Sequence, residues 1–108
     1  MSDHERVLVL GLDGVPWSLL DPWLHEGRLP HLARLIARGG RGDLRSTVPY
    51  VTAPAWTSCV TGVNPGKHGV LDFAMQRAND YGINVVNSTW VRARPLWTIL
   101  ENRGSAWG

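Results

Sequence analysis

Cysteine is nearly absent from this 108-residue chain, which holds Cys59 and no other. A single cysteine excludes an intrachain disulfide framework and a zinc site built from several thiolates. It also fits a reducing compartment. Because Cys59 falls within a predicted helix between Ser58 and Val60, we interpret it as a small buried packing residue rather than a nucleophile.

Long apolar runs are absent too. No run approaches the roughly 20 residues needed to span a bilayer, so we expect no membrane partner. The first six residues are rich in charge and lack the basic start, apolar core and small-residue cleavage site of a signal peptide. We therefore expect a cytoplasmic protein.

Lysine occurs once, at Lys67, and the other ten basic residues are scattered arginines in a chain of net charge +2. A protein that binds nucleic acid typically gathers its basic residues in a run or on one face. We therefore expect no nucleic-acid partner. The composition, 44% hydrophobic and 19% charged, is that of a folded domain, and it leaves the oligomeric state open.

The order of predicted elements indicates an α/β fold. The apolar run at residues 6–12 has no polar face, which is typical of a strand buried on both sides in a parallel sheet. Proline at the first position and glycine after the end predict a helix from Pro30 to Arg38. Residues 63–69 are turn-rich and predict a loop. We further expect a turn or helix at 17–25, strands at 42–48 and 70–74, an extended segment at 83–86, and helices at 53–61 and 95–102.

The end of the chain suggests a fragment of a larger protein. Gly104 closes the last predicted helix, where an α/β protein normally continues into another strand. We therefore expect residues 1–108 to be a single partial domain, the N-terminal part of a longer one. With much of the sheet missing, the strand at 6–12 would expose apolar surface, so we also expect poor solubility or oligomerisation.

Asp13 is the first candidate site residue. It ends the predicted strand at 6–12, and Gly14 permits a tight turn directly after it. Ligand sites of open α/β sheets lie beyond the carboxyl ends of the strands, so Asp13 is a candidate ligand. The alternative is an aspartate that caps the next turn.

Thr52 is the second candidate, since it stands where the helix at 53–61 should begin. Amides at a helix N-terminus have unpaired N–H groups that can hold an anion. A threonine there is most often an N-cap, and its hydroxyl becomes a nucleophile only with the help of a base or a metal. A carboxylate and a hydroxyl at two such element ends can share a metal ion used in phosphoryl chemistry.

Three separated segments stand out, and they read VLVLGLDG at 7–14, TAPAWTSCVTG at 52–62 and NPGKHG at 64–69. Together they resemble the type I phosphodiesterase/nucleotide pyrophosphatase family of the alkaline phosphatase superfamily. Their order and spacing agree with the family, and the resemblance is good over residues 6–73. It is specific because three separated blocks agree in sequence order.

The resemblance implies the N-terminal portion of an alkaline-phosphatase-like α/β/α sandwich with a mostly parallel sheet. It also implies a metal-dependent phosphodiesterase- or phosphatase-type hydrolase with two divalent metal ions, expected to be zinc. Asp13 matches the family's first-strand metal ligand, and Thr52 matches its nucleophile, which also coordinates a metal. The expected substrate is a small phosphoester, with nucleotides among the candidates.

The chain departs from the family pattern at Ala55, where nucleotide pyrophosphatases tend to carry an asparagine that contacts a phosphoryl oxygen. This departure leaves the nucleotide substrate open, while the reaction type stands. The family's remaining Asp and His metal ligands lie further downstream. Because zinc normally takes about four ligands, Asp13 and Thr52 alone cannot build two sites, and we expect the 108-residue chain by itself to be inactive.

Two other functions stay open. A relative within the superfamily could act on another phosphoryl or phosphonate substrate; Thr52 argues against a sulfatase, which normally needs a modified Cys or Ser at the nucleophile position. A non-catalytic binding remnant is the alternative from a different class. Near the predicted site, we expect His68 to have a structural role rather than to bind metal, and we expect Trp56 to pack rather than to stack on a ligand.

Overall fold

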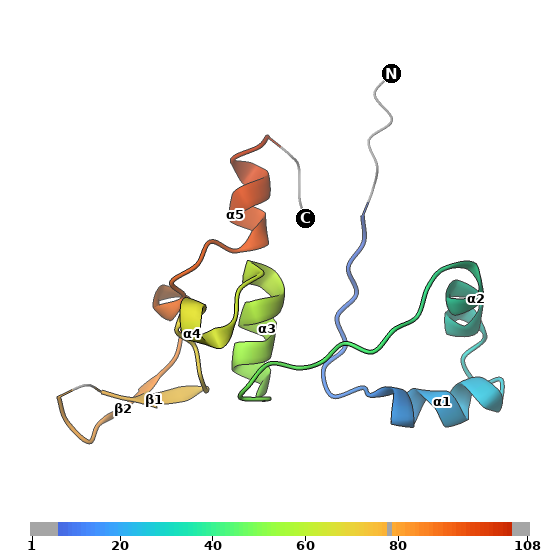
Figure 1. Cartoon of the computed structure of the whole chain (residues 1–108), viewed down its shortest axis with the longest axis horizontal. Coiled ribbons are helices and arrows are strands. Elements are labelled where there is room, and N and C mark those ends of the chain that lie inside the picture. The colour runs from blue at the N-terminus through green and yellow to red at the C-terminus, as the bar shows by residue number, and fades with distance from the viewer. Residues whose placement is uncertain (1–6, 78, 105–108) are drawn as a thin grey trace. The chain divides into compact units, whose positions relative to one another are not determined.

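The computed structural model describes residues 7–77 and 79–104. The chain divides into two compact units, Met1–Asp43 and Leu44–Gly108 (Figure 1). Among the described residues, no helix combines the length and the apolar composition needed to cross a membrane. Each unit has its own hydrogen bonds and its own packing.

The first unit contains two helices, α1 at Trp17–His25 and α2 at Pro30–Arg38. Both have the bounds that the sequence predicts. Proline at the first position of α2 has the φ angle of a helix and needs no N–H partner there, and Gly39 follows the last turn. Asp13 and Gly14 form a turn ahead of α1, with Gly14 at a φ of +65°.

Arg41 attaches the segment after α2 to α1. Its Nη2 donates to Asp21 Oδ2 at 2.9 Å, and its Nη1 lies 2.7 Å from Oδ1 of the same carboxylate. The guanidinium also stacks 4.0 Å from the ring centroid of Trp17, whose Nε1 donates to the Gly42 carbonyl. The hydrogen bond from Arg41 is the main reason that the pKa of Asp21 is lowered.

The strand predicted at residues 6–12 is not found in its described part. Residues 7–12 form neither helix nor strand, and the side chains of Val7, Leu8, Val9, Leu10 and Leu12 are each at least 61% exposed. A β-strand exists only when its backbone is paired with another strand. The apolar pattern favours a strand, but pairing depends on a partner that the pattern cannot supply.

The second unit begins with two helices joined by a tight turn, α3 at Thr52–Thr61 and α4 at Pro65–His68. Gly62 ends α3 in the left-handed conformation, at a φ of +70°. Asn64 then caps α4 by accepting a hydrogen bond from the Lys67 amide. The loop predicted at residues 63–69 is therefore wrong in part, because this cap allows one helical turn to form.

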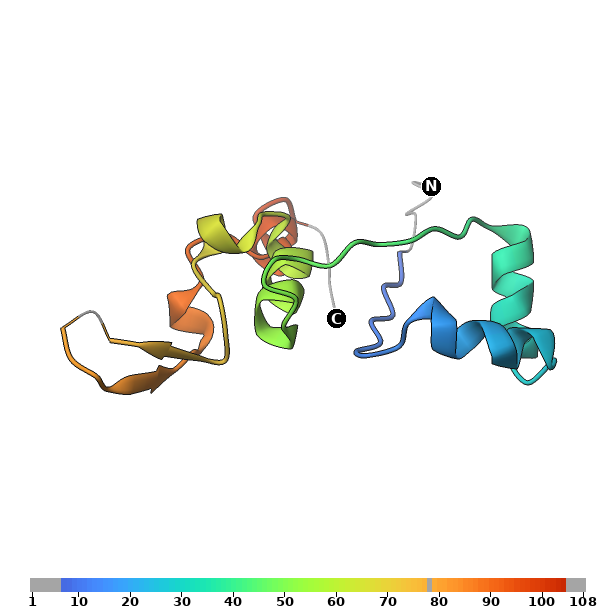
Figure 2. The same ribbon diagram turned by 60° about the horizontal axis from the view of Figure 1, so that its bottom comes forward.

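A small antiparallel hairpin follows (Figure 2). Strand β1 at Ala74–Gln76 pairs with β2 at Ile83–Val85, and the register places Met75 opposite Asn84. The short helix η1 at Ser88–Trp90 and helix α5 at Leu96–Glu101 complete the unit.

The hairpin agrees only in part with the sequence-based expectations. The extended segment at 83–86 is confirmed, the strand predicted at 70–74 begins only at Ala74, and residues 42–48 form no strand. In the parts of the chain that the structure describes, the only sheet is this antiparallel pair. The structure is compatible with an α/β class, but a parallel sheet is not among the described elements. Hairpin partners are close in sequence, whereas parallel partners must come from distant segments.

The buried residues of the described chain gather around α3 and α4. They are Pro54, Pro65, His68 and Val70. Cys59, which the sequence predicts to be a buried packing residue, is exposed on α3, so that prediction is wrong. Arg92 donates its backbone N–H to the His68 carbonyl, which ties the segment after η1 to α4. The second unit thus has a small packed centre directly behind α3.

Candidate active site

Thr52 is the first residue of α3 and not its N-cap. The N-cap is Val51, whose backbone is extended at φ −111° and ψ 151°, and no side chain caps the helix. The N-cap alternative for Thr52 is therefore wrong, because the helix starts one residue earlier than the sequence predicts. As a result, the Thr52 hydroxyl makes no capping hydrogen bond to the backbone of its own helix.

The first turn of α3 also has backbone donors to offer. The Ala55 amide donates to the Val51 carbonyl at 3.1 Å, and Pro54 has no N–H. Among the residues that the structure describes, the amides of Thr52 and Ala53 have no backbone acceptor. Unpaired amides at a helix N-terminus favour a negatively charged group.

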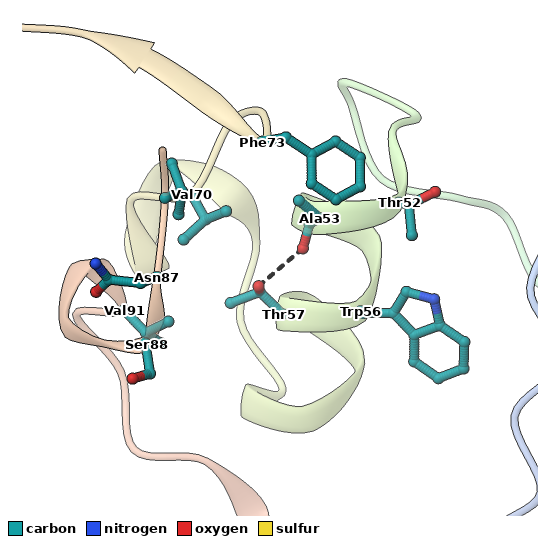
Figure 3. Close-up of a pocket in the computed structure, with 10 residues that line it drawn as sticks. Thr52, Ala53, Trp56, Thr57, Val70, Phe73, Asn87, Ser88 and Val91 are labelled. Atoms are coloured by element: carbon teal, nitrogen blue, oxygen red, sulfur yellow. Dashed lines mark hydrogen bonds between the residues drawn. The ribbon is translucent and has the colours of Figure 1, made fainter. Parts of the chain in front are cut away.

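Thr52 stands at the edge of a pocket of about 350 Å³ that lies entirely within the second unit (Figure 3). We call it the α3 pocket. One wall is the face of α3, and the others come from the segments before β1 and after β2. The lining residues are Thr52, Ala53, Trp56, Thr57, Val70, Phe73, Val86, Asn87, Ser88 and Val91.

Backbone hydrogen bonds hold the walls of the α3 pocket. The Val86 amide donates to the Phe73 carbonyl at 2.8 Å, which extends the hairpin by one bond and fixes Phe73 at its base. On the other side, the bond from Arg92 to the His68 carbonyl holds the neighbouring Val91. The pocket is therefore built by the packing of three segments that are separate in the sequence.

Several polar residues of the α3 pocket are already used by the fold. Thr57 donates its hydroxyl to the Ala53 carbonyl at 2.8 Å (Figure 3), so it contributes mainly its methyl group. Asn87 accepts from both the amide and the hydroxyl of Thr89 through its side-chain oxygen. Among the described residues, the Thr52 and Ser88 hydroxyls have no such bond.

His68 lies behind α3 and is completely buried. Its Nδ1 accepts a hydrogen bond from the Val70 amide at 3.1 Å, and its Nε2 lies 2.9 Å from Ser58 Oγ on α3. Burial lowers the pKa of His68, and a hydrogen bond with the Pro54 backbone offsets part of that effect. The predicted structural role is confirmed, since the imidazole joins α4 to α3.

The contact between Ser58 and His68 is not a nucleophile–base pair. Because a backbone N–H can only donate, Nδ1 must be the acceptor, and the proton of the neutral ring is on Nε2. Nε2 therefore donates to Ser58 Oγ. A general base for Ser58 would need the opposite tautomer, with a free lone pair on Nε2. Thr52 remains the candidate nucleophile.

Asp13 and Thr52 belong to different units, Asp13 to the first and Thr52 to the second. Asp13 is exposed in the turn before α1. Within residues 7–77 and 79–104, no three His, Cys, Asp or Glu side chains group together in a way that could hold a metal ion. The shared metal site stays a prediction.

The comparison with known protein families agrees with the three segments of the sequence. The model of the type I phosphodiesterase / nucleotide pyrophosphatase family matches residues 7–107. The chain belongs to this family. The match includes Asp13, all of α3 and every residue that lines the α3 pocket.

Two curated proteins of the same kind are similar to this family member. Human ectonucleotide pyrophosphatase/phosphodiesterase family member 1 is 29% identical over 107 residues, which cover 90% of this chain and 11% of the human protein. Rat ectonucleotide pyrophosphatase/phosphodiesterase family member 3 is 26% identical over 109 residues, covering 94% of this chain and 12% of the rat protein. The chain thus spans about a tenth of the length of these relatives. No solved structure was found to match it.

Phe73 is among the lining residues that sequence reasoning missed. The sequence shows only a lone phenylalanine directly after Asp72, 21 positions after Thr52. Packing brings its ring to the first turn of α3 (Figure 3). The turns between α3 and β1 can be predicted from the sequence, but the direction in which the chain continues after them cannot.

Proposed function

We propose that this chain is the N-terminal part of a phosphoester hydrolase in which Thr52 is the nucleophile and Asp13 a metal ligand. The chain would form one part of an alkaline-phosphatase-like α/β/α domain. The observation that carries the proposal is the position of Thr52. It is the first residue of α3, its hydroxyl makes no capping bond, and it lies at the edge of a pocket whose residues all fall within the family match.

The surroundings of Thr52 fit attack on a phosphoryl group. Its side chain is half-buried, and the adjacent amides of Thr52 and Ala53 offer donors for an anionic oxygen. In the reaction, the hydroxyl oxygen would bond to phosphorus as the ester oxygen leaves, and water would release the phosphoryl group in a second step. The α3 pocket would accept the organic part of the ester.

The resemblance implies two divalent metal ions, and the residues present supply only part of their ligands. The carboxylate of Asp13 and the hydroxyl of Thr52 are oxygen donors of a type that zinc accepts. Two donors do not complete even one site of about four ligands. When bound, such ions act as Lewis acids toward phosphoryl oxygens. We therefore infer that residues 1–108 alone are inactive, and hydrolysis of a phosphodiester by this chain with added zinc would overturn that inference.

Substitution of Thr52 in the complete protein that carries this chain tests the proposal. Thr52→Ala removes the attacking oxygen, so kcat/KM for a phosphodiester should fall by about 10³-fold or more. Thr52→Ser keeps the hydroxyl and should retain a measurable part of the activity. Thr61→Ser is the matched control, because it conserves a hydroxyl that is bonded to the Thr57 carbonyl at the other end of α3.

The outcome separates the hydrolase from the non-catalytic alternative. Full activity of Thr52→Ala would remove Thr52 from the reaction. No hydrolysis by the complete unaltered protein, in the presence of zinc and on both diesters and monoesters, would favour a binding remnant. Loss of activity in Thr61→Ser as well would point to a general defect of α3.

A further inference from the structure

The surface beside Thr52 is mostly apolar, whereas the part of a nucleotide that would lie there, the ribose, is polar. In a nucleotide, the group next to the phosphate is a ribose, whose hydroxyl and ring oxygens need hydrogen-bond partners when they leave water. The α3 pocket has six apolar lining residues, while the Thr57 hydroxyl and the Asn87 side-chain oxygen already bond within the protein. A ribose placed there would face mostly apolar surface, whereas an aromatic ring needs no hydrogen-bond partners.

Two aromatic rings flank the candidate nucleophile. Trp56 is four residues after Thr52 and so lies on the same face of α3. Phe73 approaches the first turn from the base of the hairpin (Figure 3). The Phe73 side chain is 56% exposed and the Trp56 side chain 38%, so both have apolar surface that a ligand could cover. Aromatic rings favour offset or edge-to-face contact with another ring.

We propose that the α3 pocket binds an aromatic ring carried on the ester oxygen of the substrate, and that the substrate class is aryl phosphoesters rather than nucleotides. The inference rests on the proposed function for one point only, the placement of the phosphoryl group at Thr52. The volume of about 350 Å³ is at the small end of ligand pockets, which suits one ring rather than a dinucleotide.

Binding of two phosphonates to the full chain tests the inference without any need for catalysis. Phenylphosphonate and methylphosphonate carry the same anionic group and differ in the ring. We expect phenylphosphonate to bind about tenfold more tightly, because the ring contacts apolar surface that the methyl group does not reach. The probe is NMR of the Val70 and Val91 methyl groups, whose resonances should shift with phenylphosphonate.

Phe73→Ala should reduce the ratio of the two dissociation constants to near one. Phe73→Leu, which keeps apolar volume without the ring, should give an intermediate ratio. Tyr81→Ala is the matched control, since Tyr81 is an aromatic residue of the same hairpin that is 95% exposed and does not line the pocket. It should leave the ratio unchanged.

The results distinguish this inference from the proposed function. A tenfold ratio together with full hydrolysis by Thr52→Ala would contradict the nucleophile but support the ring site. Equal affinities, no saturable binding of phenylphosphonate, an unchanged ratio in Phe73→Ala, or shifts confined to residues outside the α3 pocket would overturn the ring site. Each of these results would count against the ring site even if Thr52→Ala abolished hydrolysis.

Discussion

Thr52 and His68 differ in how their polar atoms are used. Thr52 is the first residue of α3, and its hydroxyl makes no capping bond. Both ring nitrogens of the buried His68, in contrast, have hydrogen-bond partners. A reactive group needs an available atom, and a structural group needs satisfied ones. The structural role of His68 was predicted from its place in a turn, whereas the nucleophile role of Thr52 is implied by the family resemblance and stays a prediction.

Replacement of His68 should destabilise the second unit. His68→Ala removes the bonds to Ser58 and Val70 and leaves a cavity, so the free energy of unfolding should fall by roughly 2 kcal/mol or more. Urea denaturation followed by circular dichroism measures the change. His31→Ala is the control, since His31 is exposed on α2, and it should change stability by less than about 0.5 kcal/mol. Equal effects of the two substitutions would contradict the structural role.

The same residue predicts a pH dependence of stability. Burial lowers the folded-state pKa of His68 below the ordinary value of 6.5, so the unfolded chain binds more protons between the two pKa values. The contribution of His68 to stability is fully present above about pH 6.5 and is lost as the pH falls through the folded pKa. The urea midpoint of the unaltered protein should therefore fall when the pH is lowered from 7.5. In His68→Ala the same change of pH should lower the midpoint by less. A parallel decline in both proteins would contradict this.

Among the secondary-structure elements, α1, α2, α3 and α5 could be predicted from the sequence more closely than the strands, whereas α4 lies where a loop was expected. The bounds of α1 and α2 match the expectation, and α3 differs by one residue, because proline and glycine mark helix ends locally. Strands depend on partners elsewhere in the chain, so residues 7–12 and 42–48 form no strand although the sequence favours one, whereas the extended segment expected at 83–86 contains β2. For the same reason, the sequence placed Thr52 near the start of a helix but did not predict that Phe73 lines the pocket.

Gly62 is the clearest test of a helix end. It ends α3 at a φ of +70°, and no atom lies within 4 Å of where a Cβ would stand, so only the backbone conformation opposes a side chain. Gly62→Ala should cost about 1 kcal/mol of stability, measured by thermal or urea unfolding. Gly40→Ala is the control, because Gly40 has open space and no positive φ. A neutral Gly62→Ala would mean that α3 ends differently in solution.

Considered as a whole, the chain has far more exposed apolar surface than its small packed centre can cover. The apolar residues of segment 7–12 are at least 61% exposed, and the family relatives are about ten times longer. Exposed apolar surface of this kind associates with other apolar surface. We therefore expect the 108-residue chain to self-associate in solution.

Light scattering across a concentration series measures that association. Leu8→Lys combined with Leu10→Lys removes two exposed leucines and should raise the concentration at which association begins by about tenfold. Leu44→Lys, at a single leucine that is 96% exposed outside the segment, should have a smaller effect. A monodisperse monomer of the unaltered chain at high concentration would contradict the expectation.

The most direct test of Thr52 as the nucleophile is the site at which the phosphoryl group is transiently attached. The complete protein would be mixed with an aryl phosphoester, quenched in acid within milliseconds, digested and examined by mass spectrometry. We expect a phosphorylated peptide with the modification on Thr52, absent from Thr52→Ala. Hydrolysis that proceeds with the phosphoryl group on another residue, or that continues in Thr52→Ala with no modified peptide, would contradict the account.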